Sequence, residues 1–149
     1  MRIKYTCFLT FLFLVLSCGK DKYEDNIPYT KVDFQVFLLT DFNKVLTSPG
    51  GVAITSSCRH NGGKSCGYKD HGIIVCRMMT SDSYAAYAGT CPIDLSKLNI
   101  VNDAVLKVEC SKCNRIFDLE NNGLSGNARL HGYQITMSIT NQSFTVTNY

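Results

Sequence analysis

The feature that most constrains the fold is a succession of short apolar runs in which inward and outward positions alternate. The first run, KVDFQVFLL at residues 31–39, places four apolar side chains on one face and polar ones on the other. A period of two residues is typical of a half-buried strand. Turn-forming residues separate such runs at roughly 8–12-residue spacing, with little helical periodicity. This pattern predicts an all-β sandwich or barrel.

The same alternation locates the individual strands. Residues 48–51 (SPGG) read as a turn, and Asn141-Gln142 as the tight turn of a closing hairpin. Leu106, Val108 and Cys110 should share one buried face. The expected strands are residues 31–39, 52–56, 72–78, 83–89, 104–110, 133–140 and 143–148.

The first residues indicate export from the cytoplasm. A basic start, with Arg2 and Lys4, precedes the apolar run Phe8–Leu16. Such a run is too short to span a bilayer but fits the core of a signal peptide. The residues VLSC that end at Cys18 resemble the lipobox of bacterial lipoproteins. The resemblance implies cleavage before Cys18 and lipidation of its thiol; the alternative is a secreted protein whose Cys18 merely lies near the cleavage site.

This resemblance divides the chain into three parts and implies a location. Residues 1–17 would be a lipoprotein signal peptide, residues 18–30 a lipidated cysteine and polar tether, and residues 31–149 the β domain. Acyl chains would hold the protein on a membrane, since each buried methylene contributes about 0.8 kcal/mol. The implied site is the outer membrane of a Gram-negative cell envelope.

The charge of the chain excludes one class of partner. Loss of Arg2 and Lys4 with the signal peptide lowers the formal net charge from +3 to +1. The remaining sequence has no Lys/Arg cluster with interleaved aromatic residues, so we expect no nucleic-acid partner. The protein partner is not indicated by the sequence.

Cysteine usage points to disulfides or metal. The chain has eight cysteines, of which Cys7 would leave with the signal peptide and Cys18 would be acylated. An even remainder in an envelope protein favours disulfides, although six cysteines allow 15 pairings. The six that remain are Cys58, Cys66, Cys76, Cys91, Cys110 and Cys113.

Three segments in the second half of the chain follow one another in an informative order. They are HGIIVCRMMTSDSYAAYAGTCP, VECSKCNRIFDLENNGLSGNA and RLHGYQITMSITNQSFTVTN. Together they resemble the Rieske iron–sulfur family, and the resemblance covers about residues 52–148. The family implies a small Rieske-like β domain with a C-x-H and a C-x-x-H loop holding a 2Fe-2S cluster. Cys91 and Cys110 match its cysteines, but Ile93 and Cys113 stand where the histidines should be. The resemblance therefore implies a degenerate site.

Three uses of Cys91, Cys110 and Cys113 follow from this comparison. The first is a disulfide from Cys91 to Cys110 or Cys113 that staples two loops, with no cofactor. The second is a zinc or iron site on the three thiolates, which needs a fourth ligand. The third is a remodelled 2Fe-2S cluster. The candidate fourth ligands are Asp94, His131, His60 and a water molecule.

A separate pair, Cys58 and Cys66, flanks the loop RHNGGKS. We expect these two cysteines to form a disulfide that closes a hairpin loop. The alternative is a metal site that also uses His60 and His71, but the usual C-x2–4-C spacing of zinc sites is missing.

The expected function is that of a non-catalytic module. The sequence has no Ser-His-Asp pattern and no glycine loop that would cradle a phosphate. We therefore expect a lipid-anchored binding or structural domain. The alternative is electron transfer through a retained or remodelled metal site on Cys91, Cys110 and Cys113.

Overall fold

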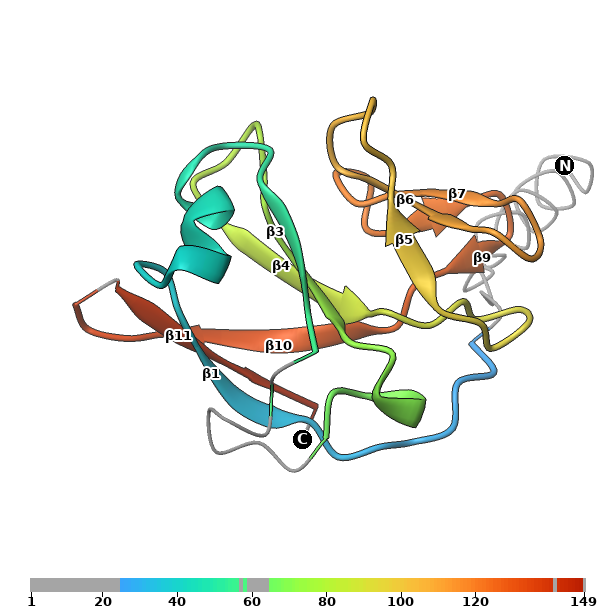
Figure 1. Ribbon diagram of the computed structural model, residues 1–149, viewed down its shortest axis with the longest axis horizontal. Helices are drawn as coiled ribbons and strands as arrows, with labels where there is room; N and C mark the ends of the chain where they lie inside the picture. The colour runs from blue at the N-terminus through green and yellow to red at the C-terminus, as the bar shows by residue number, and fades with distance from the viewer. Residues whose placement is uncertain (1–24, 57, 59–64, 141, 149) are drawn as a thin grey trace, which may run out of the picture.

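The computed structural model describes residues 25–56, 58, 65–140 and 142–148. Its architecture is all-β, as predicted, with two antiparallel sheets (Figure 1). The predicted signal peptide and Cys18 lie outside the described residues.

The first sheet curls into a half-barrel and has the strand order β1-β11-β10-β4-β3-β2. The second sheet has the order β5-β6-β7-β8-β9 and is inserted in the chain between β4 and β10. The first sheet consists of β1 (Asp33–Phe37), β2 (Val52–Thr55), β3 (Ile73–Arg77), β4 (Tyr84–Ala88), β10 (Gly132–Met137) and β11 (Ser143–Thr147). The second consists of β5 (Leu98–Ile100), β6 (Lys107–Cys110), β7 (Ile116–Asp118), β8 (Leu124–Ser125) and β9 (Ala128–Arg129).

Alternation determines which face of β1 is buried. Val32, Phe34, Val36 and Leu38 are all 6% exposed or less, while the residues between them reach solvent. In β6 the predicted face of Leu106, Val108 and Cys110 is also buried. The strand itself begins only at Lys107, because Leu106 has a left-handed φ of 55° that interrupts the extended chain.

The core consists of two apolar clusters. One lies inside the half-barrel and includes Phe34, Val75 and Phe144. The other joins the two sheets, since Ile74 of β3 and Tyr87 of β4 pack with side chains of the second sheet. The members from the second sheet and the segments next to its strands are Cys91, Leu98, Leu106, Val108, Cys110, Phe117, Leu119, Ala128 and Leu130. The inserted sheet is therefore fixed to the half-barrel by a continuous apolar contact.

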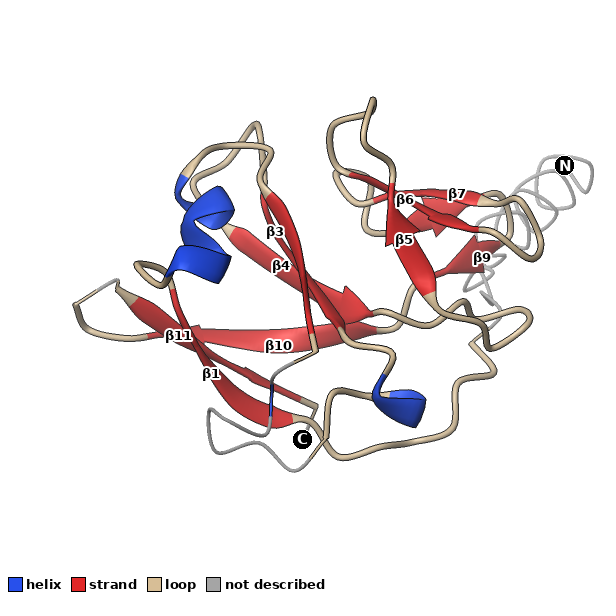
Figure 2. Cartoon of the chain, viewed as in Figure 1, coloured by secondary structure: helices blue, strands red, loops and turns tan. Residues whose placement is uncertain are grey.

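Two parts of the structure differ from the predictions. The β10–β11 hairpin forms, but Met137 pairs with Phe144, and the amide of Ser138 donates to the carbonyl of Ser143. The strand pairing therefore ends before Thr140, where the sequence placed the end of the strand; Asn141 of the predicted turn lies outside the described residues. The 3-10 helix η1 (Asp41–Thr47), which packs against β2 and β3 (Figure 2), was not predicted.

The end of the predicted tether is attached to the domain. The Asn148 side chain accepts a hydrogen bond from the Val32 amide at 3.0 Å and donates one to the Thr30 carbonyl at 2.8 Å. Further along, Asp25 contacts His131 at 2.6 Å. Residues 25–32 thus lie along the body of the protein. In the described part of the chain, none of the helices is long and apolar enough to span a membrane.

Candidate metal centre

Two loops at one end of the second sheet carry the three predicted cysteines. One begins at Cys91 and leads into β5; the other begins at Cys110 and joins β6 to β7. Leu98, the first residue of β5, pairs with Cys110, the last residue of β6. This register places both loops at the same end of the β5–β6 pair.

The two loops share one backbone design. In the first, the Cys91 amide donates to the carbonyl of residue 96 at 2.8 Å, and the Leu95 amide donates to the Cys91 carbonyl at 3.0 Å. In the second, the equivalent bonds run from the Cys110 amide to the carbonyl of residue 115 at 2.9 Å, and from the Asn114 amide to the Cys110 carbonyl at 2.8 Å. Leu95 and Asn114, each four residues after its cysteine, both have left-handed φ values, 58° and 57°. The residue three positions after the cysteine therefore has the same place in the backbone of both loops.

Asp94 is this residue in the first loop, three positions after Cys91, and Cys113 is this residue in the second loop, three positions after Cys110. The donor atoms of Cys91, Asp94, Cys110 and Cys113, which we call the Cys–Asp cluster, all lie within 4.8 Å of one another. The Sγ atoms of Cys91 and Cys113 are 3.8 Å apart. The Cys110 Sγ lies 3.5 and 3.2 Å from the two carboxylate oxygens of Asp94. Three sulfur atoms and one carboxylate thus converge from two loops.

Two residues of the Cys–Asp cluster, Cys91 and Cys110, belong to the buried apolar cluster that joins the two sheets. Cys91 and Cys110 are 0% exposed, while Asp94 and Cys113 are partly exposed. Solvent therefore reaches the cluster through Asp94 and Cys113. Its fully buried apolar neighbours in the same core cluster include Leu98, Val108 and Phe117.

Ser96 connects the two halves of the cluster. Its hydroxyl donates to Oδ1 of Asp94 at 2.5 Å, and its amide donates to the same oxygen at 3.0 Å. The same hydroxyl lies 3.0 Å from the Sγ of Cys110, which also accepts the Cys113 amide at 3.5 Å. These contacts hold the carboxylate and the Cys110 sulfur beside each other.

The acidities within the cluster differ. Burial raises the pKa of Cys91 to about 12 and also raises the pKa of Cys113. Burial acts in the same direction on Cys110, but the Ser96 hydroxyl and the loop amides outweigh it and lower the pKa of that thiol. Burial likewise opposes ionisation of Asp94, yet the Ser96 hydroxyl and amide hold the pKa of its carboxyl well below the usual range. A bound cation would favour ionisation of the remaining thiols.

The structure distinguishes among the predicted ligands. Cys91, Cys110 and Cys113 meet as expected, and Asp94 is the candidate fourth ligand that joins them. His131 contacts Asp25 and the ring of Tyr133 instead. His60 lies outside the described residues. Ile93 packs against the apolar cluster between the sheets and contributes no ligand atom.

Ser96 was missed by the sequence reasoning, and Asp94 was only one of four alternatives. The signal that would have found Asp94 is the equal spacing of Cys91-x-x-Asp94 and Cys110-x-x-Cys113. No sequence signal distinguishes Ser96 from other serines, because its role depends on the fold of the loop.

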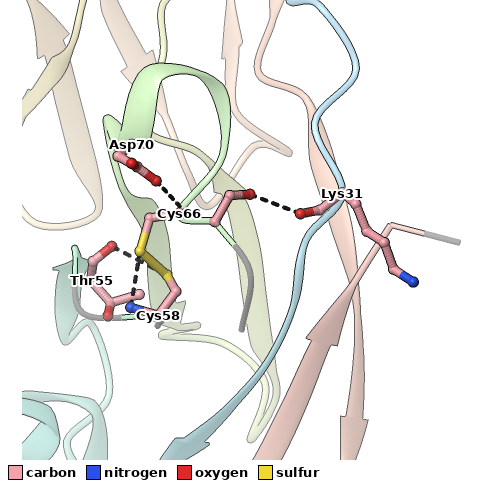
Figure 3. The surroundings of a disulfide bond; sticks show 6 residues. Lys31, Thr55, Cys58, Cys66 and Asp70 are labelled. Atoms are coloured by element: carbon pink, nitrogen blue, oxygen red, sulfur yellow. Dashed lines mark hydrogen bonds between the residues drawn. A yellow bond between two sulfur atoms is a disulfide. The ribbon is translucent and has the colours of Figure 1, made fainter. Parts of the chain in front are cut away.

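The other predicted cysteine pair lies away from this centre. Cys58 and Cys66 are at disulfide distance, with Cα atoms 5.4 Å apart (Figure 3). The Cys66 amide donates to the carboxylate of Asp70, and Ser65 donates to the Lys31 carbonyl, so this bridge also contacts the N-terminal segment. Cys76 is a buried thiol that forms no disulfide and donates to the Ala85 carbonyl at 3.7 Å; burial raises its pKa to about 12.

An open cleft of about 560 Å³ lies in the half-barrel, between the segment that follows β1, the end of η1, the β3–β4 turn and β10. Its walls combine apolar side chains such as Leu38 and Met137 with Arg77, which forms an ion pair with Asp82. None of the residues of the Cys–Asp cluster lines it.

Comparisons with family models, curated proteins and solved structures found no match to this chain. The resemblance to Rieske domains and to lipoproteins therefore stays a prediction from the residue pattern.

Proposed function

We propose that this protein is a lipid-anchored envelope module that binds one zinc ion at the Cys–Asp cluster, where the ion joins the two loops of the second sheet. The observation that carries the proposal is the convergence of three sulfur atoms and one carboxylate within 4.8 Å. Zinc is bound in proteins by cysteine thiolates, histidine nitrogens and carboxylate oxygens, and its structural sites are almost always tetrahedral with four ligands.

The distances support tetrahedral coordination. With metal–sulfur bonds of about 2.3 Å, two sulfur atoms on a tetrahedral ion lie about 3.8 Å apart. The Sγ atoms of Cys91 and Cys113 are separated by 3.8 Å. A sulfur and a carboxylate oxygen on the same ion would lie about 3.5 Å apart, and Cys110 and Asp94 are separated by 3.2 and 3.5 Å. The four groups therefore need little movement to surround an ion.

The same compactness favours one ion over a two-iron cluster. A 2Fe-2S cluster separates its ligands into two pairs, one on each iron, with bridging sulfides between them. Here the donor atoms of all four residues lie within 4.8 Å of one another, which suits a single centre. The paired loops agree with the predicted Rieske resemblance, but their ligands favour a mononuclear site.

The ligand count supports a structural role for the ion. Structural zinc sites use four protein ligands, whereas catalytic sites keep one position for water or substrate. Cys91, Asp94, Cys110 and Cys113 supply all four, and two of them are fully buried. We infer that the ion stabilises the inserted sheet and that the module acts by binding or support, without catalysis.

The anchor forms a separate part of the proposal. The residues VLSC before Gly19 support lipidation of Cys18. The described segment that begins at Asp25 follows this position closely, and it contacts His131. We infer that a short tether leads from the lipid to the domain. Mass spectrometry of the N-terminal peptide should find a diacylglycerol-modified Cys18, and an unmodified N-terminus at Met1 would contradict this part.

The metal content tests the central part of the proposal. The full chain is expressed in a Gram-negative host, purified in detergent under reducing conditions and analysed by plasma mass spectrometry. We expect one zinc per chain, lost in Cys110→Ser and retained in Cys76→Ser, whose thiol is also buried but lies outside the cluster. Metal-free protein would contradict the proposal. Iron with visible absorption would favour the electron-transfer alternative instead.

A further inference from the structure

We propose that the Cys–Asp cluster has a second closed state, in which a disulfide between Cys91 and Cys113 replaces the ion, so that metal binding is controlled by thiol oxidation. The inference rests on the proposed zinc site and adds a regulation to it. It unites two uses of these cysteines that are mutually exclusive at any one time, because a sulfur in a disulfide is no longer a thiolate ligand.

Geometry selects Cys91 and Cys113 as the partners. Their sulfur atoms lie 3.8 Å apart, and a disulfide requires about 2.05 Å, so an approach of less than about 2 Å closes the bond. The two residues lie on different loops, so this bond would connect the loops as the ion does. The same end of the sheet would thus be cross-linked in both states.

The sulfur of Cys110 is held beside Ser96 and Asp94. Cys110 Sγ lies 3.0 Å from the Ser96 hydroxyl and 3.2 Å from the nearer oxygen of Asp94, and it also accepts the Cys113 amide. These contacts keep Cys110 on the side of the carboxylate. After oxidation, Cys110 and Asp94 would be the only cluster ligands left, two fewer than a closed tetrahedral zinc site requires.

Exposure sets the order of the steps. Cys113 is partly exposed, whereas Cys91 is 0% exposed. The Cys113 thiolate therefore attacks an external disulfide RSSR, forming a mixed disulfide and releasing one RS⁻. The Cys91 thiolate then attacks the Cys113 sulfur and displaces the second RS⁻. Two cysteine thiolates lose two electrons, RSSR gains them, and the zinc ion leaves.

The test uses the full-length, zinc-loaded, reduced protein and oxidised glutathione as the disulfide. A chromogenic chelator reports free zinc, and peptide mapping identifies the bond formed. We expect one zinc and two glutathione thiols released per chain, a Cys91–Cys113 cross-linked peptide, and recovery of zinc binding after reduction. Cys76→Ser should behave as the unaltered protein does.

The outcomes separate this inference from the zinc proposal. A reduced protein without zinc contradicts the proposed function itself. Zinc that is present but stays bound in excess oxidised glutathione overturns only the redox control, as does release accompanied by a Cys110–Cys113 bond. Cys110→Ser retains both partners, so it should form the Cys91–Cys113 cross-link even where its zinc affinity is lost. Failure of that variant to form the cross-link would also overturn the inference.

Discussion

At the scale of single residues, the Cys–Asp cluster is a concentration of potential negative charge in an apolar setting. Three thiolates and one carboxylate would repel each other strongly if they were ionised without a counter-ion. Cys91 and Cys110 are fully buried, so solvent does little to screen that repulsion. A divalent cation would remove this cost, whereas without a cation the raised pKa of Cys91 keeps that thiol protonated.

Ser96 is the residue through which the donor set is oriented. Because its hydroxyl contacts both Asp94 and Cys110, Ser96→Ala should lower zinc affinity by about 10- to 100-fold, as for other groups that orient metal ligands. Competition with a chelator of known affinity measures the change. Ser111→Ala, an exposed serine of the other loop, is the matched control and should bind zinc normally. Equal affinity in both variants would contradict the role given to Ser96.

The residue pattern predicted the cysteines of the site better than its fourth ligand. Cys91, Cys110 and Cys113 were identified because an ordered resemblance linked two distant loops. That resemblance implies a ligand position at Ile93, whereas the hydrogen bonds of the two loops make Asp94 the equivalent of Cys113. The ligand position in the structure is therefore one residue later than the position that the resemblance implies. The cause is the left-handed conformation of Leu95, because leucine seldom adopts it and so gives no signal in the sequence.

At the scale of elements, the longer strands were predicted and the very short ones were not. The predicted runs at β1, β2, β3, β4, β6, β10 and β11 all contain strands. The strands β5, β7, β8 and β9 have two or three residues each, which is too short for a period of two to appear. They exist because hydrogen bonds to β6 and to each other hold them, and these tertiary pairings leave no local pattern.

The segment that leads into the first loop depends on a close approach of two backbones. A Cβ added at Gly89 would lie 2.6 Å from the Gly72 carbonyl oxygen and 3.0 Å from that of His71. Gly89→Ala should therefore destabilise the fold by about 1–3 kcal/mol, because backbone atoms cannot move aside cheaply. Gly132→Ala meets nothing within 4 Å and is expected to change stability by less than about 0.5 kcal/mol. Denaturant unfolding of both variants measures the difference; equal stabilities would contradict the close packing.

At the scale of the whole molecule, the sheet that carries the Cys–Asp cluster is an insertion in a half-barrel sheet. Strand β1 pairs with strand β11, and the Asn148 side chain forms hydrogen bonds with Val32 and Thr30 in the segment before β1. The inserted sheet contacts the half-barrel through the shared apolar cluster. Loss of the proposed zinc ion should therefore loosen the inserted sheet before the half-barrel, since the half-barrel has its own core.

The attachment of the N-terminal segment can be tested separately. Asn148→Ala removes the two hydrogen bonds to Val32 and Thr30, each worth about 0.5–1.5 kcal/mol. We expect faster tryptic cleavage after Lys31 and a small loss of stability. Asn102→Ala, at an exposed position between β5 and β6, should leave the cleavage rate unchanged. An unaltered rate in the Asn148 variant would show that the segment is held by other contacts.

X-ray absorption at the zinc edge on the purified, reduced protein tests the central claim most directly. The account predicts one shell of three sulfur atoms at about 2.3 Å and one oxygen at about 2.0–2.2 Å. It also predicts that Asp94→Cys converts the shell to four sulfur atoms. A shell rich in nitrogen or oxygen, or a metal–metal distance in the spectrum, would contradict a single ion held by Cys91, Asp94, Cys110 and Cys113.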